Sequence, residues 1–177
     1  MKKISLILLG LTISLYATTA AQMLQLYQKG EYNLACDLGA KNITRFESNE
    51  AQLSLYAFSC LKADRIDRLN TPIILLNQTA EARANASYFS MLVMQKKLLM
   101  QSLYDNISFK SSNFPTSSHI LSKVFHLYLQ SNKITKEYVD PSNTRNSYKL
   151  YTTEFNGKKT IAIDEYYDKI LTIHHVY

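Results

Sequence analysis

The sequence predicts an α+β protein, mainly helical, with a small antiparallel β element at its C-terminal end. Between residues 21 and 139, apolar residues recur at spacings of three and four, as on the buried face of an amphipathic helix. From residue 144 to residue 177, apolar and polar residues alternate instead. The pattern changes at the polar stretch 140–143, so we expect a helical domain over 21–139 with a β element over 144–177 packed on it.

Residues 1–20 have the pattern of a cleaved signal peptide. Lys2 and Lys3 precede an apolar run over 4–16, and small residues follow up to Ala20. The run is shorter than the roughly 20 residues that a membrane span needs. No cysteine lies near the expected cleavage site after Ala20, so we expect no lipid anchor. Frequent lysine, asparagine, isoleucine and tyrosine indicate an AT-rich bacterial genome, and we therefore expect a periplasmic or secreted protein.

The charge of the chain weakly favours anionic partners. The formal net charge is +6, and it falls to +4 when Lys2 and Lys3 are removed with the signal peptide. The other basic residues are spread along the sequence, whereas nucleic-acid-binding domains usually show a clustered basic face. We therefore expect no nucleic acid among the partners.

Turn signals divide the helical domain. Gly30 permits a tight turn, and the polar stretch 47–49 separates two further helices. Pro72 suits the first turn of a helix. The expected helices cover residues 21–28, 32–45, 50–62, 73–76, 80–104 and about 117–131. In the long helix over 80–104 we expect Leu92 and Leu99 to face the core and Lys96 to remain in water.

The C-terminal region predicts a three-stranded antiparallel meander. Asn156-Gly157 is a strong signal for a two-residue hairpin turn, because both residues tolerate positive φ. In the implied register Glu154 faces Lys159 and Lys149 faces Asp164. A third strand should return over 169–177. Three apolar residues should share the face that docks on the helices, namely Leu150, Ile161 and Ile163.

Cys36 and Cys60 are the two cysteines of the chain, and both lie 12 residues from Ser48. If the flanking helices pack antiparallel about that turn, the two thiols lie side by side. In the oxidising compartment of an exported protein they would then form a disulfide. A redox pair would normally be spaced Cys-x-x-Cys, and a zinc site would need further ligands nearby. A redox pair, a zinc site and a pair of buried thiols remain as alternatives to the disulfide.

A pattern of aromatic, turn and small residues precedes the second apolar helix. It consists of Tyr27, Gly30, Tyr32 and Ala35. Over residues 24–69 the chain resembles the helical hairpin of tetratricopeptide proteins, whose repeat is 34 residues long. The resemblance implies antiparallel hairpins with a concave surface that binds peptides or partner proteins. It places four residues near that groove: Leu24, Tyr27, Ser54 and Phe58.

The sequence carries no familiar catalytic motif, such as a nucleophile elbow, a phosphate-binding glycine loop or a His-Glu-x-x-His pair. His119 and His126 are seven residues apart, whereas helical metal ligands are usually three or four apart. His174 and His175 should point to opposite faces of a strand. We therefore expect no catalytic residues, no metal and no cofactor.

These observations predict a non-enzymatic interaction or scaffold protein that binds another envelope protein or a peptide. The pattern of residues predicts no particular oligomeric state. Two alternatives remain. A buried titratable cluster in a pocket would favour a periplasmic enzyme whose site is dispersed in sequence. A large apolar cavity between helices and sheet would favour a small-ligand carrier.

Overall fold

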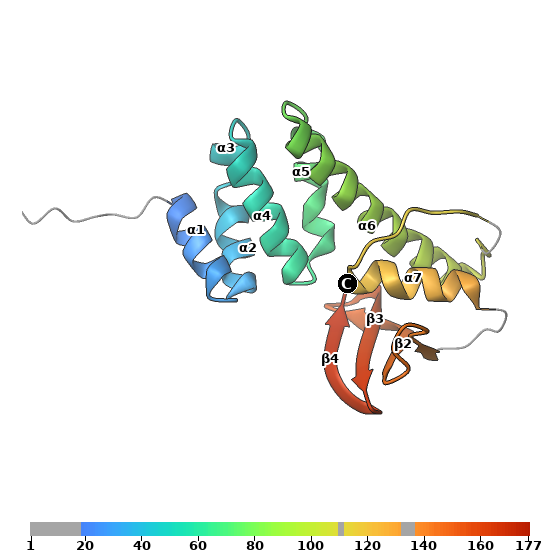
Figure 1. Cartoon of the computed structure of the whole chain (residues 1–177). Helices are drawn as coiled ribbons and strands as arrows, with labels where there is room; N and C mark the ends of the chain where they lie inside the picture. The colour runs from blue at the N-terminus through green and yellow to red at the C-terminus, as the bar shows by residue number, and fades with distance from the viewer. Residues whose placement is uncertain (1–18, 110–111, 132–136) are drawn as a thin grey trace, which may run out of the picture.

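The computed structural model describes residues 19–109, 112–131 and 137–177, so the predicted signal peptide lies almost entirely outside the described part. Helices come first and an antiparallel sheet follows, which confirms the α+β class (Figure 1). The helices are α1 (Thr19–Gln28), α2 (Tyr32–Lys41), α3 (Ile43–Phe46), α4 (Glu50–Lys62), the 3-10 helix η1 (Ile66–Leu69), α5 (Asn70–Leu75), α6 (Ala80–Asp105) and α7 (Ile120–Gln130). The strands are β1 (Glu137–Val139), β2 (Asn146–Phe155), β3 (Lys158–Tyr167) and β4 (Ile170–Val176).

Local signals explain the ends of the first helices. Gly30 has a φ of 77° in the turn between α1 and α2. The second predicted helix is divided into α2 and α3, because the Asn42 side chain donates a hydrogen bond to the Leu38 carbonyl at 2.8 Å and ends α2. Asn49 caps α4 by accepting a hydrogen bond from the Gln52 amide at 3.1 Å.

A disulfide joins α2 to α4, as predicted. The sulfur atoms of Cys36 and Cys60 are bonded, their Cα atoms are 4.7 Å apart, and both residues are fully buried. Gly39 allows the close helix approach beside the bridge, since a Cβ atom there would lie 2.4 Å from Cδ2 of Tyr56. After α4 the chain turns at Asp64, and η1 runs directly into the short α5. Nothing in this arrangement identifies a tetratricopeptide repeat.

The long helix α6 supplies much of the core with Phe89, Leu92 and Leu99, which are fully buried. Thr79 caps its first turn by accepting a hydrogen bond from the Ala82 amide at 3.1 Å. Lys96 was expected in water, but it is only 2% exposed, and its ammonium group donates to Asp67 at 2.7 Å. Pairing with a carboxylate explains how a charged side chain can be buried at this position.

The sheet has four strands in the order β1-β2-β3-β4, so the prediction of three strands was wrong. The additional strand β1 begins at residue 137, before the predicted boundary at 140–143. This strand is three residues long and buries only Tyr138 of its three residues. A strand of this length is too short for an alternating pattern to be visible in the sequence.

The predicted hairpin register is confirmed. Asn156 and Gly157 have φ values of 51° and 72°, and Glu154 pairs with Lys159. The apolar face predicted to dock is buried, with exposures of 0–1% at Leu150, Ile161 and Ile163. β3 is buried on its opposite face too, where Ala162 is fully buried. α6 contacts β2 and β3, and α7 contacts β1, so helices cover part of the sheet.

Replacing Gly39 by alanine should lower the free energy of unfolding by about 1 to 3 kcal/mol, because the new methyl group overlaps the Tyr56 ring. Denaturant melts of the oxidised protein measure the loss. Gln25→Ala in α1 is the control, since Gln25 is exposed, and it should change stability by less than about 0.5 kcal/mol. An unchanged Gly39→Ala melt would mean that α2 and α4 can separate without cost.

Replacing Ile161 by aspartate should destabilise the protein by several kcal/mol, because it buries an unpaired charge in the docked face. The matched change Thr153→Asp, on the opposite face of β2, should cost under about 1 kcal/mol. Urea unfolding of both variants decides the question. Equal losses would show that the two faces of the sheet are equally covered.

Candidate binding site at the helix–sheet junction

One histidine joins the helices to the sheet. His175 lies in β4, and its Nδ1 atom is 2.8 Å from Oδ2 of Asp64, in the turn after α4. Its Nε2 atom is 2.8 Å from Oε1 of Glu165 in the neighbouring strand β3. We call Asp64, Glu165 and His175 the junction clasp. It connects two regions that are 111 residues apart in sequence.

The junction clasp is charged at neutral pH. Burial by itself would lower the pKa of His175, but its hydrogen bonds to Asp64 and Glu165 and the charges of these carboxylates raise the pKa to about 9. The imidazolium therefore donates from both nitrogens, one to each carboxylate. Its side chain is 13% exposed, so water screens these contacts only partly.

Two aromatic rings lie beside the clasp. The Tyr177 ring stacks on His175, with centroids 5.8 Å apart and planes within 3° of parallel. Among the described residues its buried hydroxyl has no hydrogen-bond partner, and burial raises its pKa. His119 caps α7 by accepting a hydrogen bond from the Leu121 amide on Nδ1 at 3.2 Å. Burial lowers the pKa of His119 to about 4, so at neutral pH this ring is uncharged whereas His175 is charged.

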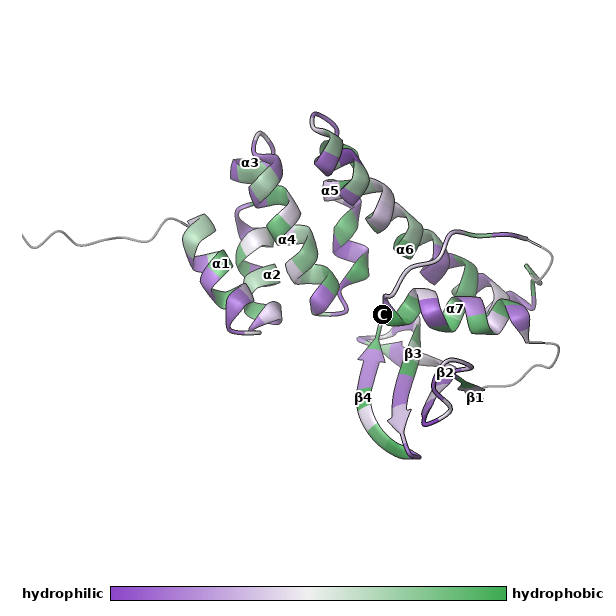
Figure 2. Ribbon diagram, viewed as in Figure 1, coloured by the Kyte–Doolittle hydropathy of each residue, from purple (hydrophilic) through white to green (hydrophobic). Residues whose placement is uncertain are grey.

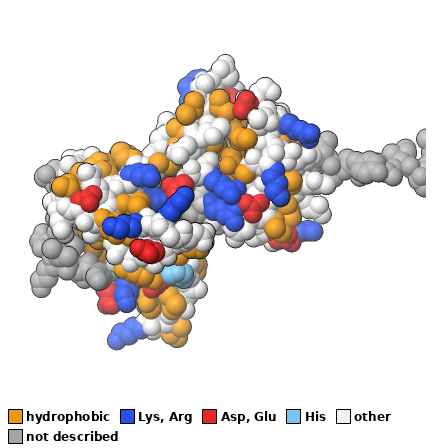
Figure 3. Space-filling model, turned by 180° about the vertical axis from the view of Figure 1, so that it is seen from behind, with side chains coloured by type: hydrophobic (Ala, Val, Ile, Leu, Met, Phe, Trp, Pro, Cys, Tyr) orange, Lys and Arg blue, Asp and Glu red, His pale blue; other side chains and the backbone are white. Residues whose placement is uncertain are grey.

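The first hollow at the junction is a groove of about 800 Å³, which we call the basic groove. Its walls come from α2, from the turn and η1 after α4, from α6, and from the tip of the β2–β3 hairpin with the end of β4. Six basic and three acidic side chains line it: Arg65, Arg68, Lys96, Lys97, Lys158 and Lys159, with Asp37, Asp64 and Asp67. Figure 3 shows basic side chains in a band across one face of the molecule, with acidic ones between them.

Each acidic side chain of the groove already has a cationic partner. Asp37 pairs with Arg65 and with Arg68, the latter at 3.1 Å. Burial would raise the pKa of Asp37, but these two guanidinium groups lower it. The carboxylate of Asp67 pairs with buried Lys96, whose pKa burial lowers, and Asp64 belongs to the junction clasp. The groove therefore keeps an excess of positive charge.

The tip of the β2–β3 hairpin adds two exposed cations to the groove. Lys158 and Lys159 make no ion pair within the part of the chain that the structure describes. The Lys159 ammonium lies 5.2 Å from the centre of the Tyr104 ring. Glu154 is its register neighbour, but the two charges form no ion pair within the described residues.

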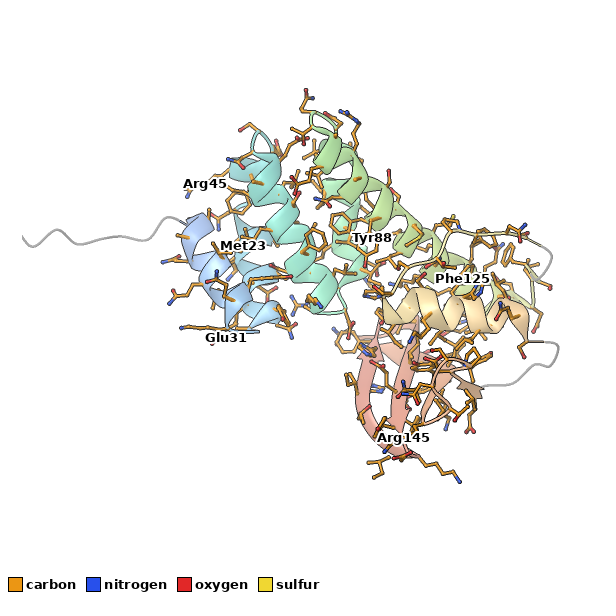
Figure 4. All side chains as sticks on the ribbon, viewed as in Figure 1. Met23, Glu31, Arg45, Tyr88, Phe125 and Arg145 are labelled. Carbon is orange, nitrogen blue, oxygen red and sulfur yellow. A yellow bond between two sulfur atoms is a disulfide. The ribbon has the colours of Figure 1, made fainter. Side chains whose placement is uncertain are left out.

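The second hollow, about 420 Å³, lies beside the clasp and is lined by Tyr27, Phe58, Tyr88, His119 and His175 among others. We call it the aromatic pocket. It contains two of the four residues that the tetratricopeptide resemblance placed near a groove. Figure 4 labels Tyr88, whose side chain extends from α6 in the space beside α4.

The other two predicted groove residues lie elsewhere. Leu24 is 44% exposed on α1 and does not line either hollow. Ser54 lies in the contact between α4 and α6, where its hydroxyl accepts a hydrogen bond from Asn85 at 3.3 Å. Phe58 itself packs edge-on against Phe89 with centroids 4.9 Å apart, so α6 covers this side of α4.

The remaining histidines and carboxylates form separate networks. His174 lies on the face of β4 opposite to His175, as predicted, and pairs with Asp164 at 2.6 Å. Lys149 faces Asp164 in the register, but Asp164 binds His174 and the Tyr151 hydroxyl instead. Within residues 19–109, 112–131 and 137–177, no group of three or more His, Cys, Asp or Glu side chains could hold a metal ion.

The comparisons with known proteins give no family. No protein-family model, curated protein or solved structure shows significant similarity to the chain. None of the described helices is long and apolar enough to cross a membrane.

Sequence reasoning missed both the junction clasp and the basic groove. Asp64 and His175 are far apart in the chain, and neither has a neighbour in sequence that signals the contact. The six basic residues of the groove occur in three short pairs, at 65 and 68, at 96 and 97, and at 158 and 159. A basic pair at a hairpin tip was the one available signal, and the pairs are brought together only in three dimensions.

The junction clasp predicts a pH dependence of stability. Because the folded pKa of His175 is about 9, above the ordinary 6.5, its contribution is complete below pH 6.5 and is lost as the pH rises through 9. The stability difference between the wild type and His175→Gln should therefore shrink by about 3 kcal/mol between pH 6 and pH 10. Denaturant melts at each pH measure it.

His126→Gln is the matched control for this experiment, because His126 is exposed on α7. Its stability difference from the wild type should stay flat over the same pH range. Parallel curves for the wild type and His175→Gln would contradict a charged clasp.

Proposed function

We propose that the chain is an exported, non-enzymatic protein that binds another envelope protein or a peptide in the basic groove. The observation that carries the proposal is the groove itself, about 800 Å³ in volume and formed by both the helices and the sheet. The groove offers charged groups beside the apolar side chains of Met100, Phe155 and Val176, so a peptide can make both kinds of contact in it.

The state of the two half-buried histidines, His119 and His175, supports binding over catalysis. Both nitrogens of His175 are engaged by carboxylates, so the ring has no lone pair to accept a proton from a substrate. The acceptor nitrogen of His119 is engaged by the Leu121 amide. Neither ring is therefore placed to act as a general base.

Export is part of the proposal and rests on the leader-like residues 1–20 and on the disulfide. A buried disulfide is compatible with an oxidising compartment, where such bonds persist. The tetratricopeptide-like character of residues 24–69 also remains part of the proposal. It rests on the sequence pattern and on the side-by-side packing of α1, α2 and α4 (Figure 1).

Site-specific photo-crosslinking in the native envelope tests the proposal. A photoreactive phenylalanine analogue at Phe155, which lines the groove and is 61% exposed, should crosslink to a protein or peptide in the envelope fraction. The same analogue at Ile74 on α5, which is 72% exposed and outside both hollows, should not. Equal capture at both positions, or none at Phe155, would contradict a binding function for the groove.

A second candidate, an enzyme with a dispersed site, is favoured by one specific observation. His119 and His175 line the same pocket with pKa values moved in opposite directions, to about 4 and about 9. Opposite shifts of neighbouring groups are a common feature of acid–base sites. Turnover of any hydrolase or oxidoreductase substrate that His119→Ala abolishes without unfolding the protein would establish this candidate instead.

A further inference from the structure

We propose that the ligand of the basic groove is an acidic segment of a partner protein, with carboxylate side chains separated by apolar ones. This inference rests on the proposed binding function and names the chemistry of the partner. It is carried by the charge, the composition and the exposure of the groove walls.

The charges of the groove are not balanced. Every acidic side chain in it is paired with at least one cation of the same site or of the junction clasp. Lys158 and Lys159 remain at the exposed hairpin tip with no ion pair among the described residues. A groove with one sign of charge in excess attracts a ligand of the opposite sign and accelerates its association.

The groups that line the groove suit carboxylates. Arg65 and Arg68 already bind the Asp37 carboxylate. Each guanidinium carries five N–H donors, and the contact with Asp37 leaves some of them for a ligand carboxylate. Their side chains are 34% and 38% exposed, so a ligand can reach them. Lys97 is 63% exposed and lies 3.9 Å from Asp67, which leaves its ammonium accessible to a second carboxylate.

The composition of the walls favours a peptide over a polyphosphate. Three fixed carboxylates lie between the basic side chains, and they would repel a ligand with a negative charge at every repeat. The groove also offers apolar contacts, which a polyphosphate chain does not use. They come from Phe155, which is 61% exposed, and from the half-buried Met100 and Val176. An acidic peptide with interspersed apolar residues satisfies both features.

The binding test uses the oxidised protein and a fluorescein-labelled peptide of three Glu-Leu-Glu-Gly repeats. Fluorescence anisotropy should show binding that weakens as salt rises from 50 to 500 mM. The double variant Lys158→Glu/Lys159→Glu should weaken binding by about tenfold or more, because it reverses two exposed charges of the groove. Both positions are exposed, and a thermal melt verifies that the variant folds.

The matched control is Lys41→Glu/Arg45→Glu, which makes the same change of charge at exposed positions on α2 and α3 outside both hollows. It should alter the affinity by less than about twofold. Equal losses in the two variants would show that only the net charge of the protein matters and would overturn the site.

Competition distinguishes the class of ligand. The glutamine version of the peptide should not displace the probe, whereas the unlabelled glutamate version should. Displacement by a single-stranded dT12 oligonucleotide at lower concentration than by the glutamate peptide would overturn the assignment to an acidic peptide. Preferential displacement by vesicles of anionic lipid would overturn it in the same way.

The two proposals can fail separately. If Phe155 crosslinks to an envelope protein but the glutamate peptide does not bind, the acidic ligand is wrong and the binding function stands. If the peptide binds in the groove but Phe155 captures nothing in the envelope, the acidic preference is real and the proposed protein-binding function is wrong.

Discussion

The contact between His175 and two carboxylates is the interaction on which the junction depends. It fixes the turn after α4 against β3 and β4, and the walls of both hollows come from these elements. Tyr104 of α6 also reaches the sheet, where its hydroxyl donates to the carbonyls of Thr153 and Thr160 at 3.0 Å. A charged imidazolium that donates to two acceptors has a defined geometry, which a purely apolar contact would not give.

The helical side of the junction is held just as firmly. Cys36 directly precedes Asp37, so the disulfide to Cys60 fixes the position from which Asp37 reaches Arg65 and Arg68. Arg68 also lies 3.9 Å from the Cys36 sulfur. The covalent bond and the ion pairs therefore act on the same corner of the groove, and they present its guanidinium groups at little further entropic cost on binding.

Burial gives the two sides of the junction different electrostatic characters. Burial lowers the pKa of His119 and removes its charge, whereas the hydrogen bonds from His175 to Asp64 and Glu165 raise its pKa against the effect of burial. Lys96 follows the same rule, since it remains in the interior only with Asp67 beside it. At the surface, β4 begins with exposed apolar side chains directly after the β3–β4 turn, with Ile170 70% exposed (Figure 2).

The sequence by itself determined the features that depend on near neighbours. Helical periodicity, the Asn156-Gly157 turn and the placement of the two cysteines are local signals, and they predicted the helices, the hairpin register and the disulfide. Tertiary structure decided the strand β1, the burial of Lys96, the junction clasp and the basic groove. These depend on which distant segments meet, because a three-residue strand or a buried lysine is stable only when its partner is supplied from elsewhere in the chain.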